Sequence, residues 1–159
     1  MKILLACDSY KEFASSKEVG KLIQLGLSSG VESKVISISD GGEGFLDSIS
    51  EYIDGESITC KVFDPIMRYT SSKYFKSNSL AIIEFSEACG VQKFNSRVRH
   101  FTSSSSYGVG QLINNAINNG CTEIVVGLGG AATGEAGIGA AQALGVSFTD
   151  SDGNELKNK

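Results

Sequence analysis

A glycine-rich segment near the C-terminal end of the chain constrains the fold most. Glu123 precedes the apolar, β-branched run Ile124–Val126, Gly127–Gly130 is rich in glycine, and Ala131–Glu135 is made of small and polar residues. This order predicts a buried strand, a tight turn, and a helix that begins directly after the turn. The N–H groups of such a turn and the positive end of the helix dipole favour a bound phosphate or carboxylate. The same glycines also suit a tight strand-to-helix corner without a ligand.

The N-terminal part alternates strands and helices. Lys2–Ala6 is a short apolar run typical of a buried parallel strand, and Val35–Ile38 is a second strand candidate. Between them, Ser15 and Glu18 have the spacing of a capping box, and apolar residues at helical intervals follow. Another helical pattern follows the Asp40–Gly44 loop. This alternation predicts an α/β sheet.

Several polar residues follow the predicted parallel strands. In open α/β sheets, ligands bind beyond the carboxyl ends of the strands. Asp8, Lys11 and the Asp40–Gly44 loop each come directly after such a strand. We therefore expect them to lie at one edge of the sheet, next to a small-molecule ligand.

The middle of the chain departs from this alternation. Ser57–Phe63 and Tyr69–Phe75 flank a turn that holds the sole proline, which predicts an antiparallel hairpin, and Leu80–Phe85 predicts a further strand. The fold class expected is α/β, a mainly parallel sheet with flanking helices plus a β-hairpin excursion. Residues 95–106 are polar and include His100, so we place a boundary there. Residues 1–95 are then an α/β lobe with the hairpin, and residues 96–159 a second α/β segment, incomplete at its C-terminus. Val146–Thr149 predicts a last strand.

Composition narrows the function classes. The 159 residues are 41% hydrophobic and 20% charged, which is enough for a packed core, and the net charge of −4 gives no support for nucleic-acid binding. Four dispersed cysteines without metal-ligand spacing indicate reduced thiols. No apolar run approaches the length of a membrane span. We expect a cytoplasmic protein with a small-molecule partner, and neither a nucleic-acid nor a membrane partner.

The glycine-rich turn fits two nucleotide-binding motifs to different degrees. A P-loop is excluded because no lysine follows the glycines. A dinucleotide fingerprint is matched by Gly127, Gly129 and Ala132, with Asp150 at the spacing of a ribose-binding acid. A dinucleotide-binding oxidoreductase domain is therefore one alternative, although the fingerprint requires more βα units downstream than the sequence contains.

Five motifs occur in an order that resembles the bacterial glycerate kinase family. They are Cys7–Lys11, Asp40–Gly44, Asp64–Pro65, Thr102–Ile113 and Gly127–Thr133. In that family the first usually reads P-D-S-F-K-G, the second A-D-G-G-E-G and the last G-L-G-G-S-A-T-N-D-G-G. The resemblance runs along nearly the whole chain. It implies two α/β lobes with the active site between them, and it makes this chain the N-terminal part of a two-lobed kinase.

The resemblance implies phosphorylation of glycerate to phosphoglycerate by direct phosphoryl transfer, with ATP and Mg²⁺ as cofactors. Such a transfer needs a phosphate cradle, charge neutralisation and a positioned hydroxyl group. We expect Asp8 or Asp40 to bind Mg²⁺ or to accept the hydroxyl proton, and Lys11 to neutralise charge. The other residues expected to contact substrate or phosphate are Ser9, Gly41, Gly42, Glu43, Gly129, Gly130, Thr133 and Glu135.

The sequence also departs from the family pattern. Family members are more than twice as long, so we expect this chain to be truncated and its activity to depend on a missing C-terminal half. Gly134–Ala136 stands where the family usually has Asn-Asp-Gly. The alternative function is a non-catalytic remnant that binds a small anion, or a subunit that needs a separate C-terminal half.

Overall fold

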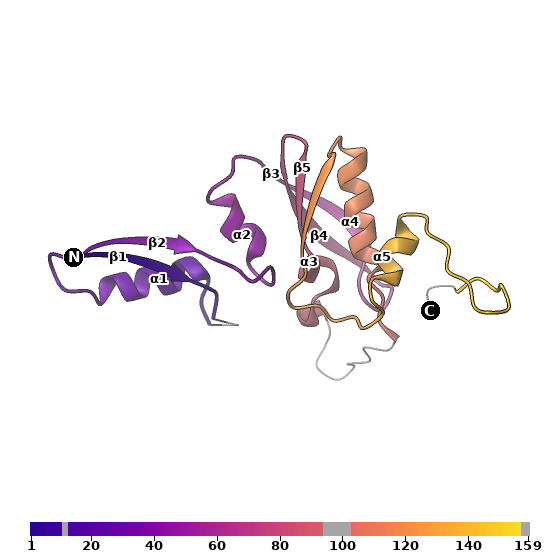
Figure 1. The fold of residues 1–159 in the computed structure, drawn as a ribbon, viewed down its shortest axis with the longest axis horizontal. Coiled ribbons are helices and arrows are strands. Elements are labelled where there is room, and N and C mark those ends of the chain that lie inside the picture. The colour runs from indigo at the N-terminus through magenta and orange to yellow at the C-terminus, as the bar shows by residue number, and fades with distance from the viewer. Residues whose placement is uncertain (11–12, 94–102, 157–159) are drawn as a thin grey trace.

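The computed structural model describes residues 1–10, 13–93 and 103–156, which form two units of unequal size (Figure 1). The N-terminal unit consists of β1 (Lys2–Cys7), α1 (Ser16–Leu25) and β2 (Glu32–Ser37), and its two strands pair in parallel. The predicted capping box begins α1. The Ser15 hydroxyl accepts the N–H of Glu18 at 3.4 Å, and the Glu18 carboxylate accepts the N–H of Ser15 at 2.8 Å.

The larger unit is built on a four-stranded sheet in the order β3-β4-β5-β6. The predicted hairpin is confirmed as the β3/β4 pair; β4/β5 is also antiparallel, and β5/β6 is parallel. The sheet is therefore mixed rather than mainly parallel. The elements of this unit are α2 (Phe45–Ser50), β3 (Glu56–Phe63), β4 (Tyr69–Ser77), β5 (Leu80–Glu84), α3 (Phe85–Cys89), the 3₁₀ turn Val91–Lys93, α4 (Tyr107–Asn118), β6 (Glu123–Gly127) and α5 (Ile138–Ala143).

Both faces of this sheet are covered. Tyr74 and Ile83 belong to the main apolar cluster, which α3 and α4 cover, whereas their chain neighbours Phe75 and Ile82 pack with Leu46 of α2. Successive residues of a strand point to opposite faces of the sheet, so the two clusters lie on opposite faces. Helices α3 and α4 cover one face and α2 covers the other. The molecule is thus an α/β protein, as the sequence predicted.

The sheets divide the described residues at a different place from the boundary at residue 95. β5 and β6 lie on opposite sides of that boundary and pair in one sheet, whereas the break between sheets falls between β2 and β3. Two local predictions are wrong. Lys2–Ala6 is a strand but is not buried, because α1 covers only one face of its sheet. Val146–Thr149 forms no strand, only an isolated bridge between Thr149 and Glu155.

The four cysteines are all free thiols. Burial raises the pKa of the Cys89 thiol to about 12. None of the helices within the described ranges has the length and apolar character needed to cross a membrane.

Candidate functional site

The structure brings the two predicted glycine-rich loops into direct contact. The turn after β6 packs against the Asp40–Gly44 loop, and the N–H of Gly129 donates to the carbonyl of Gly41 at 3.0 Å. A Cβ on Gly129 would lie 2.5 Å from both the N and the Cα of Gly42. Real side chains do not approach backbone so closely, so the contact itself requires glycine at this position.

The two candidate acids, Asp8 and Asp40, are each held by their own loop. Oδ1 of Asp8 accepts the N–H of Ser9 at 2.7 Å, and Oδ1 of Asp40 accepts the N–H of Gly42 at 2.8 Å. Among the described residues, neither Oδ2 atom accepts a hydrogen bond. Each acid therefore presents one oriented oxygen that is available to a cation or a hydroxyl group.

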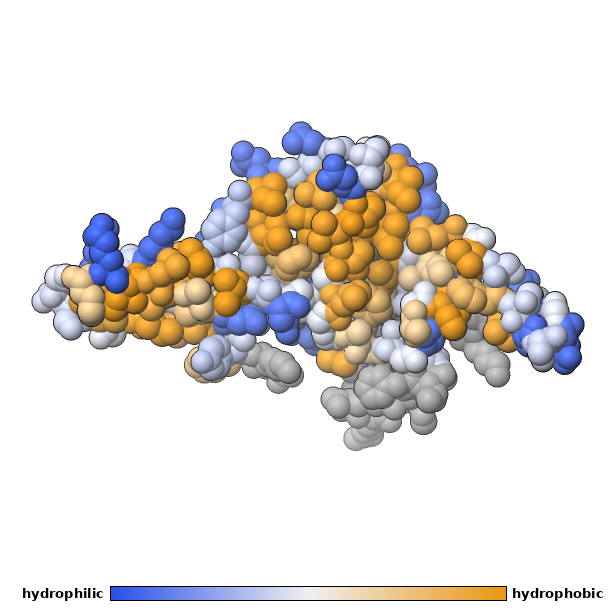
Figure 2. All heavy atoms as spheres, viewed as in Figure 1, coloured by the Kyte–Doolittle hydropathy of each residue, from blue (hydrophilic) through white to orange (hydrophobic). Residues whose placement is uncertain are grey.

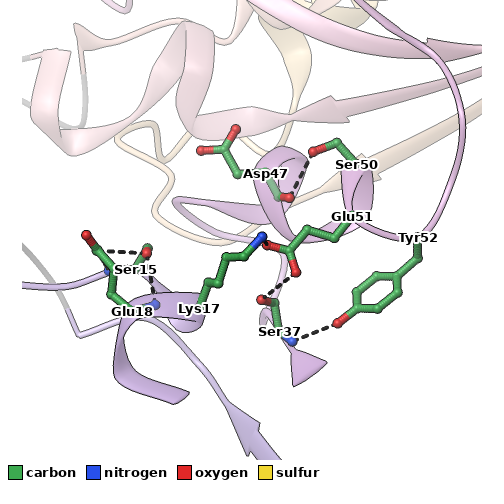
Figure 3. Close-up of polar contacts among 8 residues, drawn as sticks. All are labelled: Ser15, Lys17, Glu18, Ser37, Asp47, Ser50, Glu51 and Tyr52. Atoms are coloured by element: carbon green, nitrogen blue, oxygen red, sulfur yellow. Dashed lines mark hydrogen bonds and ion pairs between the residues drawn. The ribbon is translucent and has the colours of Figure 1, made fainter. Parts of the chain in front are cut away.

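A cleft of about 590 Å³ separates the N-terminal unit from the larger unit. Two predicted site residues, Ser9 and Glu43, line it from opposite sides. Figure 3 shows the contacts that join the two units beside this cleft. Lys17 of α1 forms an ion pair with Glu51 at 2.9 Å, and the Ser37 hydroxyl donates to the same carboxylate at 3.2 Å.

The lining of the cleft is acidic. Both described lysines on its wall are already paired, Lys17 with Glu51 and Lys73 with Asp47 at 3.3 Å. A free phosphate is therefore disfavoured here, whereas a phosphate that carries a metal cation is tolerated. The carboxylates on the wall are Glu18, Glu43, Asp47, Glu51, Glu84 and Glu87.

Glu84 is one of the cleft residues that the sequence did not identify as a candidate. It ends β5, is only 4% exposed, and accepts hydrogen bonds from the N–H of Leu46 at 3.3 Å and from the Ser86 hydroxyl. Burial raises the pKa of the Glu84 carboxyl above its usual range, and the two hydrogen bonds oppose that shift. A buried carboxyl in a cleft is a functional-site candidate. The available signal was a charged residue at the end of an otherwise apolar strand.

The turn after β6 does not lead directly into a helix, which corrects the prediction. α5 begins only at Ile138, because Gly130, Ala136 and Gly137 have positive φ values of 69°, 56° and 82° and interrupt helical geometry. In the first turn of α5, the N–H of Ala140 donates to the Ser106 hydroxyl at 2.9 Å, so this amide is not available to an anion. The turn after β6 therefore lacks the contribution that a helix start would make to anion binding.

The dinucleotide alternative loses its structural basis for the same reason. Its fingerprint requires a helix that opens at the glycine turn. Asp150, the candidate ribose ligand, instead accepts the N–H groups of Asp152 and Asn154, each at 2.9 Å. This carboxylate closes its own surface turn.

Glu135 lies between two helix starts. Its carboxylate accepts the N–H of Ser106 at 3.2 Å, just before α4, and also the N–H of Gly139 in α5. These contacts give Glu135 a structural role whether or not it also touches a ligand. Thr133 is half-buried and Gly130 is exposed in the same segment, and neither lines the acidic cleft.

Lys11, the candidate neutralising cation, lies outside the described residues, and so does His100. Tyr107 packs edge-on against Phe63 with ring centroids 6.1 Å apart, which indicates a packing role at the start of α4. Among the described residues, no group of three or more His, Cys, Asp or Glu side chains is arranged to hold a metal ion.

The sequence and the fold of this chain both match known proteins over nearly its whole length. A family model described as the glycerate kinase family matches residues 3–159. A glycerate kinase from Neisseria meningitidis is 35% identical over 98% of this chain and 43% of its own length, and a glycerate 2-kinase from Escherichia coli is 33% identical over 98% and 42%. A solved structure assigned as glycerate kinase 2 from Salmonella typhimurium superposes with a TM-score of 0.78 at 33% identity, over 98% of this chain and 43% of that chain. The chain thus spans less than half the length of these relatives, and it belongs to the glycerate kinase family.

Proposed function

We propose that this chain provides the N-terminal part of an enzyme that phosphorylates glycerate with ATP by direct phosphoryl transfer. One observation carries the proposal: the two glycine-rich loops that resemble the family motifs pack backbone to backbone, with Asp40 at their junction. Phosphoryl transfer depends on the orientation and the electrostatics of the reacting groups more than on covalent chemistry, so it requires loops held in a fixed arrangement.

In this proposal Asp8 and Asp40 provide the carboxylates of the site. Either acid would bind Mg²⁺ or accept the proton of the substrate hydroxyl, and its Oδ1 atom is held in place by a backbone N–H. Mg²⁺ is usually bound by one or two carboxylates together with nucleotide phosphates, so these oxygen donors fit it without a larger carboxylate cluster. Mg²⁺ would supply positive charge that neutralises the phosphates of ATP.

The proposed phosphate and substrate contacts come from both loops. The N–H of Gly129 is engaged by the Gly41 carbonyl, and that of Gly42 by Asp40. Within the described part of the chain, the N–H groups of Glu43 and Gly130 have no such partner, so both are proposed donors to an anion. Lys11 remains the proposed neutralising cation, and Ser9, Gly41, Glu43, Thr133 and Glu135 remain proposed contacts.

A coupled assay of ADP formation with glycerate and Mg·ATP tests the proposal. The chain is assayed alone and mixed with the C-terminal part of the Neisseria meningitidis relative. We expect Asp8→Asn and Asp40→Asn to lower kcat by at least about a hundredfold, with Asp54→Asn, an exposed carboxylate that is not among the proposed site residues, as matched control. Near-normal turnover of both variants would rule out the assigned acids. Absence of glycerate-dependent ADP in every mixture would refute the kinase function.

The second candidate is a subunit that acts only together with a separate C-terminal half. The chain aligns with 43% of its Neisseria meningitidis relative, so the rest of that relative supplies the complementary part for the test. Activity that appears only on mixing supports this candidate, and ADP formation by the chain alone contradicts it.

A further inference from the structure

Glu84, at the end of β5, uses both of its carboxylate oxygens to bond protein groups. Oε2 accepts the N–H of Leu46 at 3.3 Å, and Oε1 accepts the Ser86 hydroxyl. The side chain is only 4% exposed, although it forms part of the cleft wall. Burial of a carboxylate costs free energy unless its hydrogen bonds are made. The role of Glu84 therefore depends on what these two neighbours hold in place.

The Leu46 bond connects Glu84 to the loop that carries Asp40. Leu46 is the second residue of α2, and the Asp40–Gly44 loop leads directly into this helix, which lies between the N-terminal unit and the four-stranded sheet (Figure 1). The Leu46 side chain packs with Phe75 and Ile82 of the sheet, and Figure 2 shows apolar side chains gathered over this middle part of the molecule. Apolar packing has no preferred direction. The hydrogen bond to Glu84 adds that direction and fixes how the start of α2 is oriented.

The ends of β5 and β6 hold the loop at two points. Glu84 and Gly127 are partners in the parallel β5/β6 register, so they lie at the same level of the sheet. A Cβ on Gly127 would lie 2.5 Å from the carbonyl oxygen of Gly41 and 2.6 Å from Cδ1 of Phe45. The end of β6 therefore contacts the loop near its start and again where α2 begins. Glu84 holds the next residue along the chain, so the loop is fixed at both ends.

We propose that Glu84 is a positioning residue of the kinase site. By accepting the N–H of Leu46, it holds the Asp40–Gly44 loop in the orientation that presents the Asp40 carboxylate to the substrate. This role rests on the proposed function, because it concerns an acid assigned there. It requires an acceptor oxygen and not a negative charge. In Glu84→Gln the amide oxygen can accept the Leu46 N–H, and the amide nitrogen can donate to the Ser86 hydroxyl, which accepts as well as donates.

Amide hydrogen exchange, measured by NMR on this chain without substrate, tests the positioning. Glu84→Met keeps the length of the side chain but removes both acceptor oxygens. We expect exchange of the Leu46 amide to become at least about tenfold faster. The Gly42 amide, which donates to Asp40, should also exchange faster, because the loop loosens as a whole. Glu84→Gln should keep both exchange rates within about threefold of the parent chain.

Tyr74→Phe is the matched control for a general loss of stability. Tyr74 is fully buried, and its hydroxyl donates to Oδ1 of Asn115 at 3.1 Å on the sheet face that α4 covers. This variant therefore loses a hydrogen bond in the same unit but away from the loop. Its Leu46 and Gly42 amides should exchange close to the parent rates. Equal acceleration of these amides in Tyr74→Phe and Glu84→Met would overturn the proposal, and so would unchanged exchange in Glu84→Met.

Turnover separates positioning from a direct role of the Glu84 charge. In the mixture with the C-terminal part of the Neisseria meningitidis relative, we expect Glu84→Gln to keep kcat within about threefold and Glu84→Met to lose at least about tenfold. Loss of turnover in Glu84→Gln, with its loop amides still protected, would overturn the positioning role even if Glu84→Met does not fold. Exchange rates in the expected order, in a chain that never turns over, would contradict the proposed reaction alone.

Discussion

Replacing Gly129 by alanine tests whether the two glycine-rich loops form one packed unit. The new Cβ would lie 2.5 Å from the N and Cα of Gly42 and 3.0 Å from Oδ1 of Asp40. Carbon atoms in good contact lie about 3.5–4.0 Å apart, so the loops must separate by about 1 Å. Rotation of a side chain cannot relieve the contact, because the nearest atoms belong to the backbone.

The expected cost follows from two effects. Overpacking of a well-packed site costs about 1–3 kcal/mol. Separation of the loops also stretches the 3.0 Å hydrogen bond between Gly129 and Gly41. Its complete loss would add about 0.5–1.5 kcal/mol. Since 1 kcal/mol shifts the Tm of a chain of this size by about 2–4 °C, we expect the Tm to fall by at least about 2 °C.

Thermal unfolding followed by circular dichroism measures this change. Gly26→Ala is the matched control, because Gly26 has φ −83° and its added Cβ would meet only the Ile23 carbonyl oxygen, at 3.4 Å. We expect this control to melt close to the parent chain. If Gly129→Ala and Gly26→Ala melt at the same temperature, the loops do not pack as described and the proposed site loses its framework.

Three further experiments test individual groups. Glu135→Ala leaves the N–H groups of Ser106 and Gly139 without their acceptor, so we expect the free energy of unfolding in urea to fall by about 1–3 kcal/mol, and an unchanged value would exclude the bridging role. The pKa of Glu84 in the folded chain is raised above 4.5, so the native state binds the proton of this carboxyl more tightly than the unfolded state does. The protonated Glu84 therefore stabilises the fold below about pH 4.5, and this contribution is lost as the pH rises through the folded pKa. Urea titrations of Glu84→Gln should lack that decline relative to the parent chain, and parallel pH profiles would contradict the assignment. The pKa of about 12 at Cys89 predicts that iodoacetamide at neutral pH does not label this thiol in the folded chain, whereas the half-buried Cys7 reacts. Mass spectrometry measures the labelling, and equal labelling of both cysteines would contradict the prediction.

Much of the local structure could be read from neighbouring residues. The Ser15/Glu18 capping box, the helix after the Asp40–Gly44 loop and the hairpin around Asp64–Arg68 appear where their patterns predicted them. Each depends on contacts between residues a few positions apart, or on hydrophobic periodicity, and both are visible in a sequence window. The helix expected directly after Gly130 failed because positive φ values at three residues interrupt it, and alanine at position 136 gives no local warning of such a value.

The candidate site follows partly from the sequence and partly from the tertiary structure. The sequence by itself determined the family motifs, the glycines of both loops and the acids that follow β1 and β2. Only the tertiary structure decided that Gly129 rests on Gly42, that Glu84 is buried in an acidic cleft, and that Glu135 bridges two helix starts. The reason is physical: these outcomes depend on close packing between segments distant in the chain, whose distances and burial no local pattern encodes.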